Sequence, residues 1–118
     1  MILLDTNAVI WVVRNHPRIG NLIRRPSLRI SPVTILELQL LAEIGRIRLD
    51  VRNVLADERW RVDDPPALDW FTIAAEESWT RDPFDRLIVA HARLRRWRLA
   101  TADIRILERL RPSERFEL

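Results

Sequence analysis

Four acidic residues stand where a carboxylate could do chemistry. Asp5 ends a short apolar run at residues 1–4, and Asp103 follows a strand predicted at residues 98–101. Glu37 and Asp85 lie on segments whose spacing of apolar residues predicts helices. An ionised carboxylate on an apolar face is costly unless a cation or hydrogen-bond donors compensate it. The chemistry of this chain therefore depends on what compensates these four acids.

Asp5 and Asp103 occupy equivalent positions, each between a predicted strand and a predicted helix. In open α/β sheets, ligands bind beyond the carboxyl ends of the strands, so both residues are aimed at the usual place for a site. An acid at this position can also cap the following helix by accepting hydrogen bonds from its free N–H groups. The local sequence leaves both interpretations open.

Glu37 lies on a helix predicted from Pro32 to about Ile44, with Gly45 as its C-terminal stop. At 100° per residue, Glu37 falls on a stripe with Val33, Leu40, Leu41 and Ile44, which we expect to be buried. The alternative is that Glu37 reaches solvent at the end of the stripe or pairs with an arginine.

The segment Asp82-Pro83 predicts the start of a helix that continues to about Trp97. Asp82 fits the N-cap position and Asp85 the third helical position, as in a capping box. For Asp82 we favour this capping role. Asp85 aligns with Val89 and Ala92 and points along the buried side.

Considered together, the four acids favour a metal site. Clustered carboxylates cannot all stay ionised without a cation. Oxygen ligands without His or Cys suit one or two Mg²⁺ or Mn²⁺ ions rather than Zn²⁺. Such ions activate water and neutralise the charge of phosphate esters. Of the two histidines, His16 lies in a turn, and His91 is expected to be a hydrogen-bonded core residue.

The remaining elements are short strands that alternate with helices. Further strands are predicted at 28–30, 60–62 and 116–118, and helices at 8–13, 19–25, 51–58, 67–78 and 103–110. This alternation predicts an α/β fold, in which a central parallel sheet of four to five short strands carries helices on both faces. With 118 residues, the chain is expected to form a single domain, residues 1–118.

The composition excludes several classes of chemistry. The chain has no cysteine, so zinc–thiolate sites, cysteine nucleophiles and disulfides are excluded. It has no lysine either, which excludes Schiff-base chemistry and P-loop phosphate binding. We see no membrane span or signal peptide, so we expect a cytoplasmic protein without a membrane partner.

All 20 basic residues are arginine, the residue that binds phosphate through planar, bidentate contacts. The net charge of +3 is modest, so charge alone is weak support for a nucleic-acid partner. One candidate RNA-binding run is Arg93, Arg95, Arg96 and Arg98; a second group is Arg14, Arg18, Arg24 and Arg25. The alternative for each group is a solvated helix face.

At this point the sequence resembles a known family. The motifs are Leu-Leu-Asp5-Thr-Asn, Ser31-x-x-Thr34-x-x-Glu37, Arg81-Asp82-Pro-Phe-Asp85-Arg86-Leu-Ile-x-Ala and Thr101-Ala-Asp103. In this order, over essentially the whole chain, they resemble the PIN domain, and within it the VapC-type toxins of type II toxin–antitoxin systems. One departure is Thr80, where relatives often have His.

The resemblance implies a PIN-like, Rossmann-like fold and a Mg²⁺- or Mn²⁺-dependent endoribonuclease that leaves a 5′-phosphate and a 3′-hydroxyl. Asp5, Glu37, Asp85 and Asp103 match the catalytic, metal-binding acids of the family. Thr6, Asn7 and Thr101 match the polar residues that support the acids in that family. Asp82 is expected to support the site or to cap the helix that follows it. Arg86 is expected to steady the acids or to contact a substrate phosphate.

The resemblance also implies partners: a tRNA or rRNA substrate, and a VapB-like antitoxin that neutralises the toxin and covers the acidic pocket. A homodimer is expected as well. The spacing of Ile35, Leu38 and Ala42 gives the helix at 32–44 a second apolar face, which fits a dimer seam or antitoxin groove. The alternative is a helix enclosed within its own domain.

Three other functions are weighed on the same residues. A phosphoacceptor signalling domain would need a lysine, and an aspartyl phosphatase would need an acid where Asn7 stands. The remaining alternative is a non-catalytic RNA- or protein-binding module on the same fold.

Overall fold

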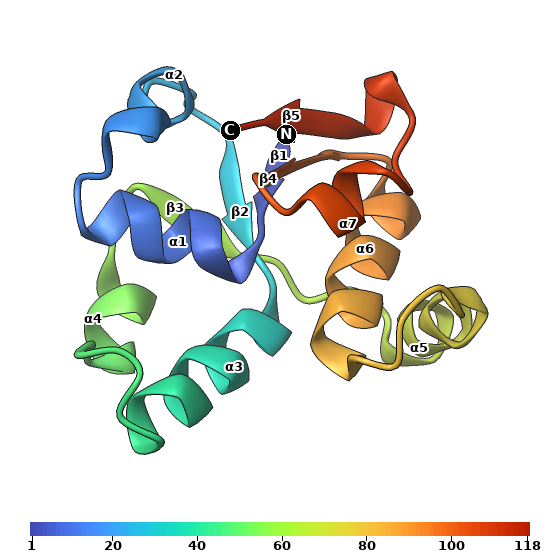
Figure 1. Cartoon of the computed structure of the whole chain (residues 1–118), viewed down its shortest axis with the longest axis horizontal. Coiled ribbons are helices and arrows are strands. Elements are labelled where there is room, and N and C mark those ends of the chain that lie inside the picture. Colours follow the sequence, from blue (N-terminus) through green and yellow to red (C-terminus); the bar gives the residue numbers. More distant parts are fainter.

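The computed structural model describes all 118 residues and contains one five-stranded sheet in the order β3-β2-β1-β4-β5 (Figure 1). All four strand pairs are parallel. The strands are β1 (Ile2–Leu4), β2 (Leu28–Ile30), β3 (Trp60–Val62), β4 (Arg98–Thr101) and β5 (Arg115–Glu117). The predicted parallel sheet is confirmed, and its last strand lies one residue earlier than expected.

The helices follow the predicted order; α1 begins two residues earlier than predicted, and the other helices are shorter than predicted. They are α1 (Thr6–Val13), α2 (Gly20–Ile23), α3 (Pro32–Glu43), α4 (Val51–Ala56), α5 (Ala67–Glu76), α6 (Pro83–Arg95) and α7 (Ile104–Leu107), with 3₁₀ turns at Pro17–Ile19 and Pro112–Glu114. α4 ends early because the Asp57 carboxylate accepts a hydrogen bond from the Arg59 N–H (2.9 Å) and turns the chain toward β3. α6 ends at Arg95 and is capped by Arg96, whose φ of 59° is left-handed.

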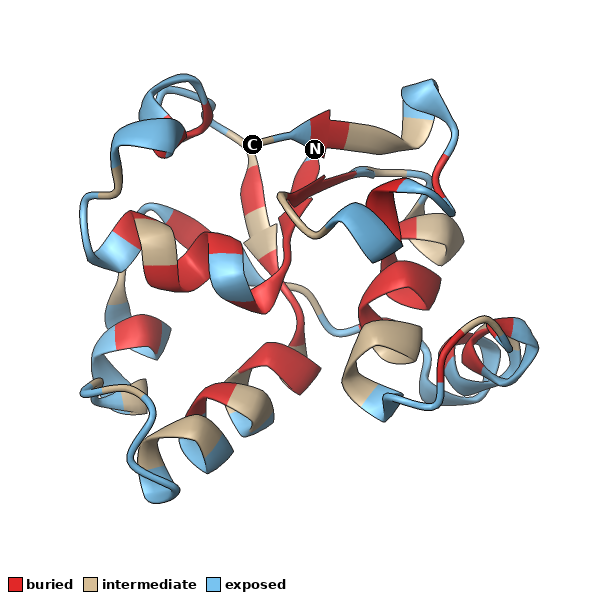
Figure 2. Ribbon diagram, viewed as in Figure 1, coloured by how far each residue is buried: buried red, intermediate tan, exposed pale blue.

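Two apolar cores lie on the two faces of the sheet, as the alternation of side chains along a strand requires. Ile2 and Leu4 of β1 pack with α1, α2 and α4 on one face. Leu3 packs with α5, α6 and α7 on the other. Figure 2 shows the central strands buried and the outer surfaces of the helices exposed. The expectation of helices on both faces is confirmed.

The predicted buried stripe of α3 is wrong in its second half. Leu40 is 40% exposed and Ile44 65% exposed. The residues that α3 does bury, Val33, Thr34 and Leu38, lie in its first turns. In Figure 1 the helix starts beside the sheet and then runs away from it, so its last turns lie against α4 and the loop before it instead of the sheet. The core therefore meets α3 on a face that includes Thr34 and Leu38, whereas Leu40 and Ile44 lie on an exposed face with Leu36.

The strand order reverses between β1 and β4, so the boundary between these two strands is a topological switch point. From β1 the chain proceeds to β2 and β3 on one side, and then returns to place β4 and β5 on the other. The Asp5 N–H donates to the Ala100 carbonyl (3.1 Å), which fixes the ends of these two strands side by side. Such a switch point is where open α/β sheets bind ligands. No helix combines the length and apolar character needed to span a bilayer.

Candidate metal centre

A small pocket of about 50 Å³ lies at the carboxyl ends of β1 and β4. It is lined by all four predicted acids and five neighbours: Asp5, Thr6, Asn7, Glu37, Leu41, Asp85, Ile88, Asp103 and Ile106. The acids come from four places in the chain, namely the ends of two strands and the helices α3 and α6. The fold therefore brings the four acids predicted to form the site to one pocket, whereas Asp82 lies outside its lining.

Asp5 both caps a helix and lines the pocket. It is 5% exposed, and its Oδ1 accepts from the Ala8 N–H at the start of α1 (2.7 Å). Burial raises the pKa of Asp5 to about 6, although hydrogen bonds from Thr101 and the Ala8 N–H act to lower it. The negative charges of Asp103 and Glu37 raise it further. The two roles left open by the sequence are therefore compatible.

Glu37 is held by a threonine. The Thr6 hydroxyl donates to Glu37 Oε1, and it lies 3.3 Å from the hydroxyl of Thr34. Burial raises the pKa of Glu37, the Thr6 hydrogen bond opposes this, and the charge of Asp82 adds to it. Glu37 makes no ion pair with an arginine. The Glu37 carboxylate is therefore stabilised only by a neutral hydrogen-bond donor, and no positive side chain balances its negative charge.

Asp82 and Asp85 divide the roles expected at the start of α6. Asp82 Oδ1 accepts from the N–H groups of Phe84 (2.8 Å) and Asp85 (3.4 Å), so Asp82 is the cap. The Asp85 carboxylate has no hydrogen-bond donor. Burial raises the pKa of Asp85 to about 6, and the charges of Asp82, Asp103 and Glu37 contribute.

Asp103 completes the pocket at the start of α7. Its Oδ1 accepts from the Arg105 N–H (2.9 Å), and its own N–H donates to Thr101 Oγ1 (3.0 Å). Thr101 therefore contacts two of the four acids, in line with a supporting role. Asn7 also lines the pocket, with an exposed side chain.

The arginines near the pocket were only partly predicted. Arg86 donates to the carbonyls of Thr80 (2.7 Å) and Ala75 (3.4 Å), so it ties α6 to the end of α5 instead of bonding the acids. Arg105, which the sequence analysis did not single out, carries a positive charge that partly opposes the rise in the pKa of Asp85. Its place in the first turn after Asp103 was the available signal.

The run of arginines at the end of α6 does not form one free surface. Arg95 pairs with Asp63 (2.8 Å), and Arg98 lies over the Phe116 ring (4.9 Å). Arg93 is held by Glu77 and Glu114. Arg96 makes no ion pair and is exposed. The four share a sequence segment but have four different environments.

The donors in the pocket fit a divalent cation in kind. They are carboxylate oxygens, the ligands that Mg²⁺ and Mn²⁺ prefer. Two of the acids, Asp5 and Asp85, have a pKa near 6, and a bound cation would favour their ionised forms. The present arrangement of the donors is not that of a formed site, since no three acids are grouped to hold one ion. Asp5 and Glu37 are instead turned to protein donors.

Residues 2–111 match the sequence pattern of the PIN domain family. The chain belongs to this family. A comparison with curated proteins found no match.

Several solved structures share the fold along nearly the whole chain. A toxin–antitoxin complex from Klebsiella pneumoniae is 18% identical, with a TM-score of 0.69 and 100% of both chains covered. VapBC2 from Rickettsia felis, bound to a DNA fragment from its promoter, is 20% identical, with a TM-score of 0.67 and coverage of 96% and 95%. DNA-bound VapBC from Salmonella typhimurium is 30% identical, with a TM-score of 0.64 and coverage of 98% and 96%.

Proposed function

We propose that this protein is a Mg²⁺- or Mn²⁺-dependent endoribonuclease of the VapC type, acting in the cytoplasm as a toxin that an antitoxin neutralises. The observation that carries the proposal is the pocket at the switch point, where four acids from separate elements converge. Membership of the PIN domain family and the similarity to chains from toxin–antitoxin complexes support it.

In this proposal, Asp5, Glu37 and Asp85 hold the main ion, and Asp103 holds a second ion or orders a water molecule. When bound, the ion neutralises phosphate charge and makes water more acidic. Thr6 orients Glu37 through its hydroxyl, and Thr101 orients the backbone of Asp103. Arg105, beside Asp85, is placed to receive a phosphate oxygen of the RNA.

The direct test is Asp5→Asn, because Asn preserves the shape and the cap but not the charge. We expect purified wild-type protein with Mg²⁺ to cleave total RNA, and the variant to lose this activity by several orders of magnitude. Asp69→Asn, on the exposed face of α5, is the matched control. Undiminished cleavage by folded Asp5→Asn would remove the assignment. Mapping 5′ ends of cellular RNA after brief expression would then identify the tRNA or rRNA target.

The alternative is a non-catalytic RNA- or protein-binding module. It is favoured by one observation, that no three acids are grouped to hold an ion. Calorimetric titration of the metal-free protein with Mn²⁺ separates the two. Binding that is lost in Asp5→Asn and Asp85→Asn supports the nuclease, and absence of binding supports the module.

The assembly is proposed to be a homodimer that binds a VapB-like antitoxin. Leu36, Leu40 and Ile44 form an exposed apolar stripe along one face of α3, at 54%, 40% and 65% exposure. The face predicted to form the seam, Ile35, Leu38 and Ala42, does not do so, because Leu38 is fully buried in the domain's own core and Ile35 packs against that core. We assign the exposed stripe to the seam between two copies instead. Light scattering should give twice the chain mass for the wild type and a lower mass for Leu40→Glu. A strictly monomeric wild type at micromolar concentration would refute the dimer.

A further inference from the structure

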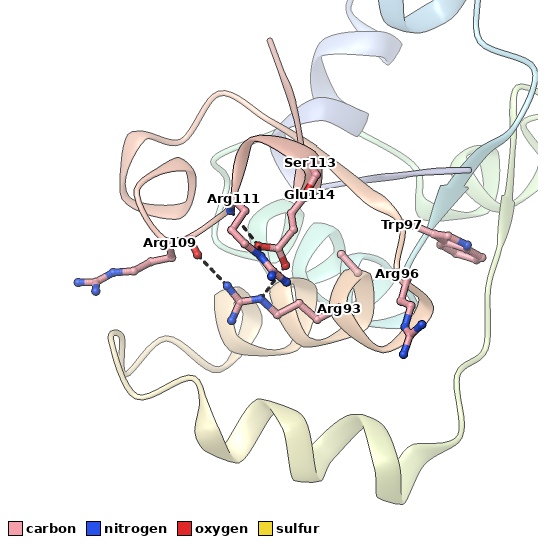
Figure 3. Close-up of a pocket in the computed structure, with 8 residues that line it drawn as sticks. Arg93, Arg96, Trp97, Arg109, Arg111, Ser113 and Glu114 are labelled. Atoms are coloured by element: carbon pink, nitrogen blue, oxygen red, sulfur yellow. Dashed lines mark hydrogen bonds and ion pairs between the residues drawn. The ribbon is translucent and has the colours of Figure 1, made fainter.

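A second and larger hollow, of about 650 Å³, lies where α6 ends and the chain passes from Arg109 to Glu114 (Figure 3). We call it the arginine cavity. Its polar lining residues are Arg93, Arg96, Arg109, Arg111, Ser113 and Glu114, of which only the last is acidic. The four guanidinium groups outnumber the two carboxylates that pair with them, Glu114 and the adjoining Glu77, so the surface carries a net positive charge.

Part of the arginine cavity is a fixed framework. The Arg93 guanidinium bonds Glu77, the Arg109 carbonyl (2.7 Å) and Glu114 (3.3 Å). Glu114 also accepts from the Arg111 N–H (2.8 Å) and contacts its Nε (3.1 Å). One carboxylate is thus shared between two arginines. Arg93 is held by three partners and its side chain is 32% exposed, whereas the Arg111 side chain is 80% exposed.

The other arginines are available to a ligand. Arg96 and Arg109 are exposed and neither makes an ion pair; the Arg109 guanidinium lies over the Trp79 ring (5.9 Å), which leaves its charge unpaired. Figure 3 shows Arg96 and Arg109 extending from opposite sides of the hollow, with Arg111 between them. A spread row of guanidinium groups suits successive phosphates of an extended backbone better than one compact anion, which would require the groups to converge.

The arginine cavity is connected to the acidic pocket through two helices. α6 begins at Asp82 and Asp85, and α7 is capped by Asp103. α6 ends at Arg95, and the turns that follow α7 end at Arg111. The segment from Asp82 to Arg95 and the segment from Asp103 to Arg111 therefore both run from the pocket to the arginine cavity. The 13 residues of α6 span about 20 Å at the usual helical rise. A few nucleotides of single strand can cover that distance.

We propose that the arginine cavity is a second docking site, which binds the sugar–phosphate backbone of single-stranded RNA some nucleotides away from the acidic pocket. This rests on the proposed function for its choice of RNA as ligand. Arg96, Arg109 and Arg111 contact phosphates, and Arg93 and Glu114 hold the surface in shape. Binding here is independent of base sequence and of divalent metal.

The test measures binding without cleavage. Fluorescence anisotropy with a labelled 12-nucleotide oligouridylate is followed in EDTA over a series of salt concentrations. The test variant is Arg96→Gly with Arg111→Gln, because glycine suits the left-handed position at 96. We expect about tenfold weaker binding and a salt slope smaller by about 0.7 for each lost phosphate contact. The control, Arg46→Gln with Arg48→Gln, removes the same charge from an exposed loop after α3.

Several outcomes overturn the proposal: equal losses in the two double variants, unchanged binding in the test variant, or displacement of the RNA by millimolar inorganic phosphate at constant ionic strength. The last would reassign the cavity to a free anion. If the test variant fails to fold, the exposed single change Arg109→Gln takes its place. Because EDTA is present, the result is separate from nuclease activity: binding with no cleavage by the wild type in Mg²⁺ would refute the nuclease and leave the docking site standing.

Discussion

The hydroxyl of Thr6 donates a hydrogen bond to the carboxylate of Glu37, which joins the first turn of α1 to the middle of α3. The bond fixes one acid of the pocket relative to the β1 end, where Asp5 lies. Thr6→Val keeps the shape and removes the donor, so we expect Mn²⁺ affinity to fall about tenfold, as for loss of an outer-shell partner. Thr6→Ser keeps the donor and serves as the control. Calorimetry that finds Thr6→Val equal to the wild type would exclude this role.

The buried charge of Asp5 should reduce stability above pH 6. Its pKa is raised from 3.8 to about 6, so the folded state binds the proton more tightly than the unfolded state does. The free energy of unfolding therefore falls as pH rises through this window. In EDTA, Asp5→Asn should match the wild type near pH 4 and exceed it at pH 7 by at most about 3 kcal/mol.

Urea denaturation across this pH range measures the difference. Asp69→Asn, an exposed acid on α5, should show no such pH dependence. If Asp5→Asn were less stable than the wild type at pH 7, the conclusion that the buried charge of Asp5 destabilises the folded protein would be contradicted. Stability gained where metal binding is lost is the expected signature of a site residue.

Asp63 should stabilise the contact between the end of β3 and α6. It lies 2.7 Å from Nε2 of the fully buried His91 and 2.8 Å from Nε of Arg95. Burial acts to raise the pKa of Asp63, but hydrogen bonds from Arg95 and His91 outweigh it and lower the pKa. The stabilisation is therefore present at neutral pH and is lost as pH falls through the lowered pKa.

We expect Asp63→Asn to lower the free energy of unfolding by about 2 kcal/mol at pH 7, because Arg95 loses its charged partner. The deficit should shrink in acid. Asp64→Asn changes the neighbouring exposed acid and controls for net charge. Equal effects of the two substitutions would show that the contact with α6 is unimportant. Thermal or urea unfolding by circular dichroism suffices.

Arg105 should assist cleavage from the rim of the pocket. Arg105→Ala removes the positive charge beside Asp85 and a potential phosphate ligand. We expect kcat/KM for RNA to fall about tenfold or more, the worth of one hydrogen bond to a charged group. Arg48→Ala, on an exposed loop, is the matched loss of charge. Full activity in Arg105→Ala would place this residue outside the site.

The sequence by itself determined the local structure around the site. The apolar run before Asp5 gave β1, and the pairs Ser31-Pro32 and Asp82-Pro83 started α3 and α6 at the residues expected. These features depend on neighbouring residues alone, through side-chain alternation, caps and the fixed φ of proline. The same logic placed Asp5, Asp85 and Asp103 at strand ends or helix starts on one edge of a parallel sheet, whereas Glu37 was assigned only to a helix face.

The tertiary structure decided which of these residues meet. It paired Arg95 with Asp63 and buried His91 against the same carboxylate, although 28 residues separate His91 from Asp63. It turned Arg86 toward the Thr80 carbonyl and left the last turns of α3 exposed. Such outcomes depend on which distant segments pack together, and a helical or strand period carries no information about that. The acids could be predicted because each is positioned by its own element, whereas the arginines could not, because long side chains choose among distant partners.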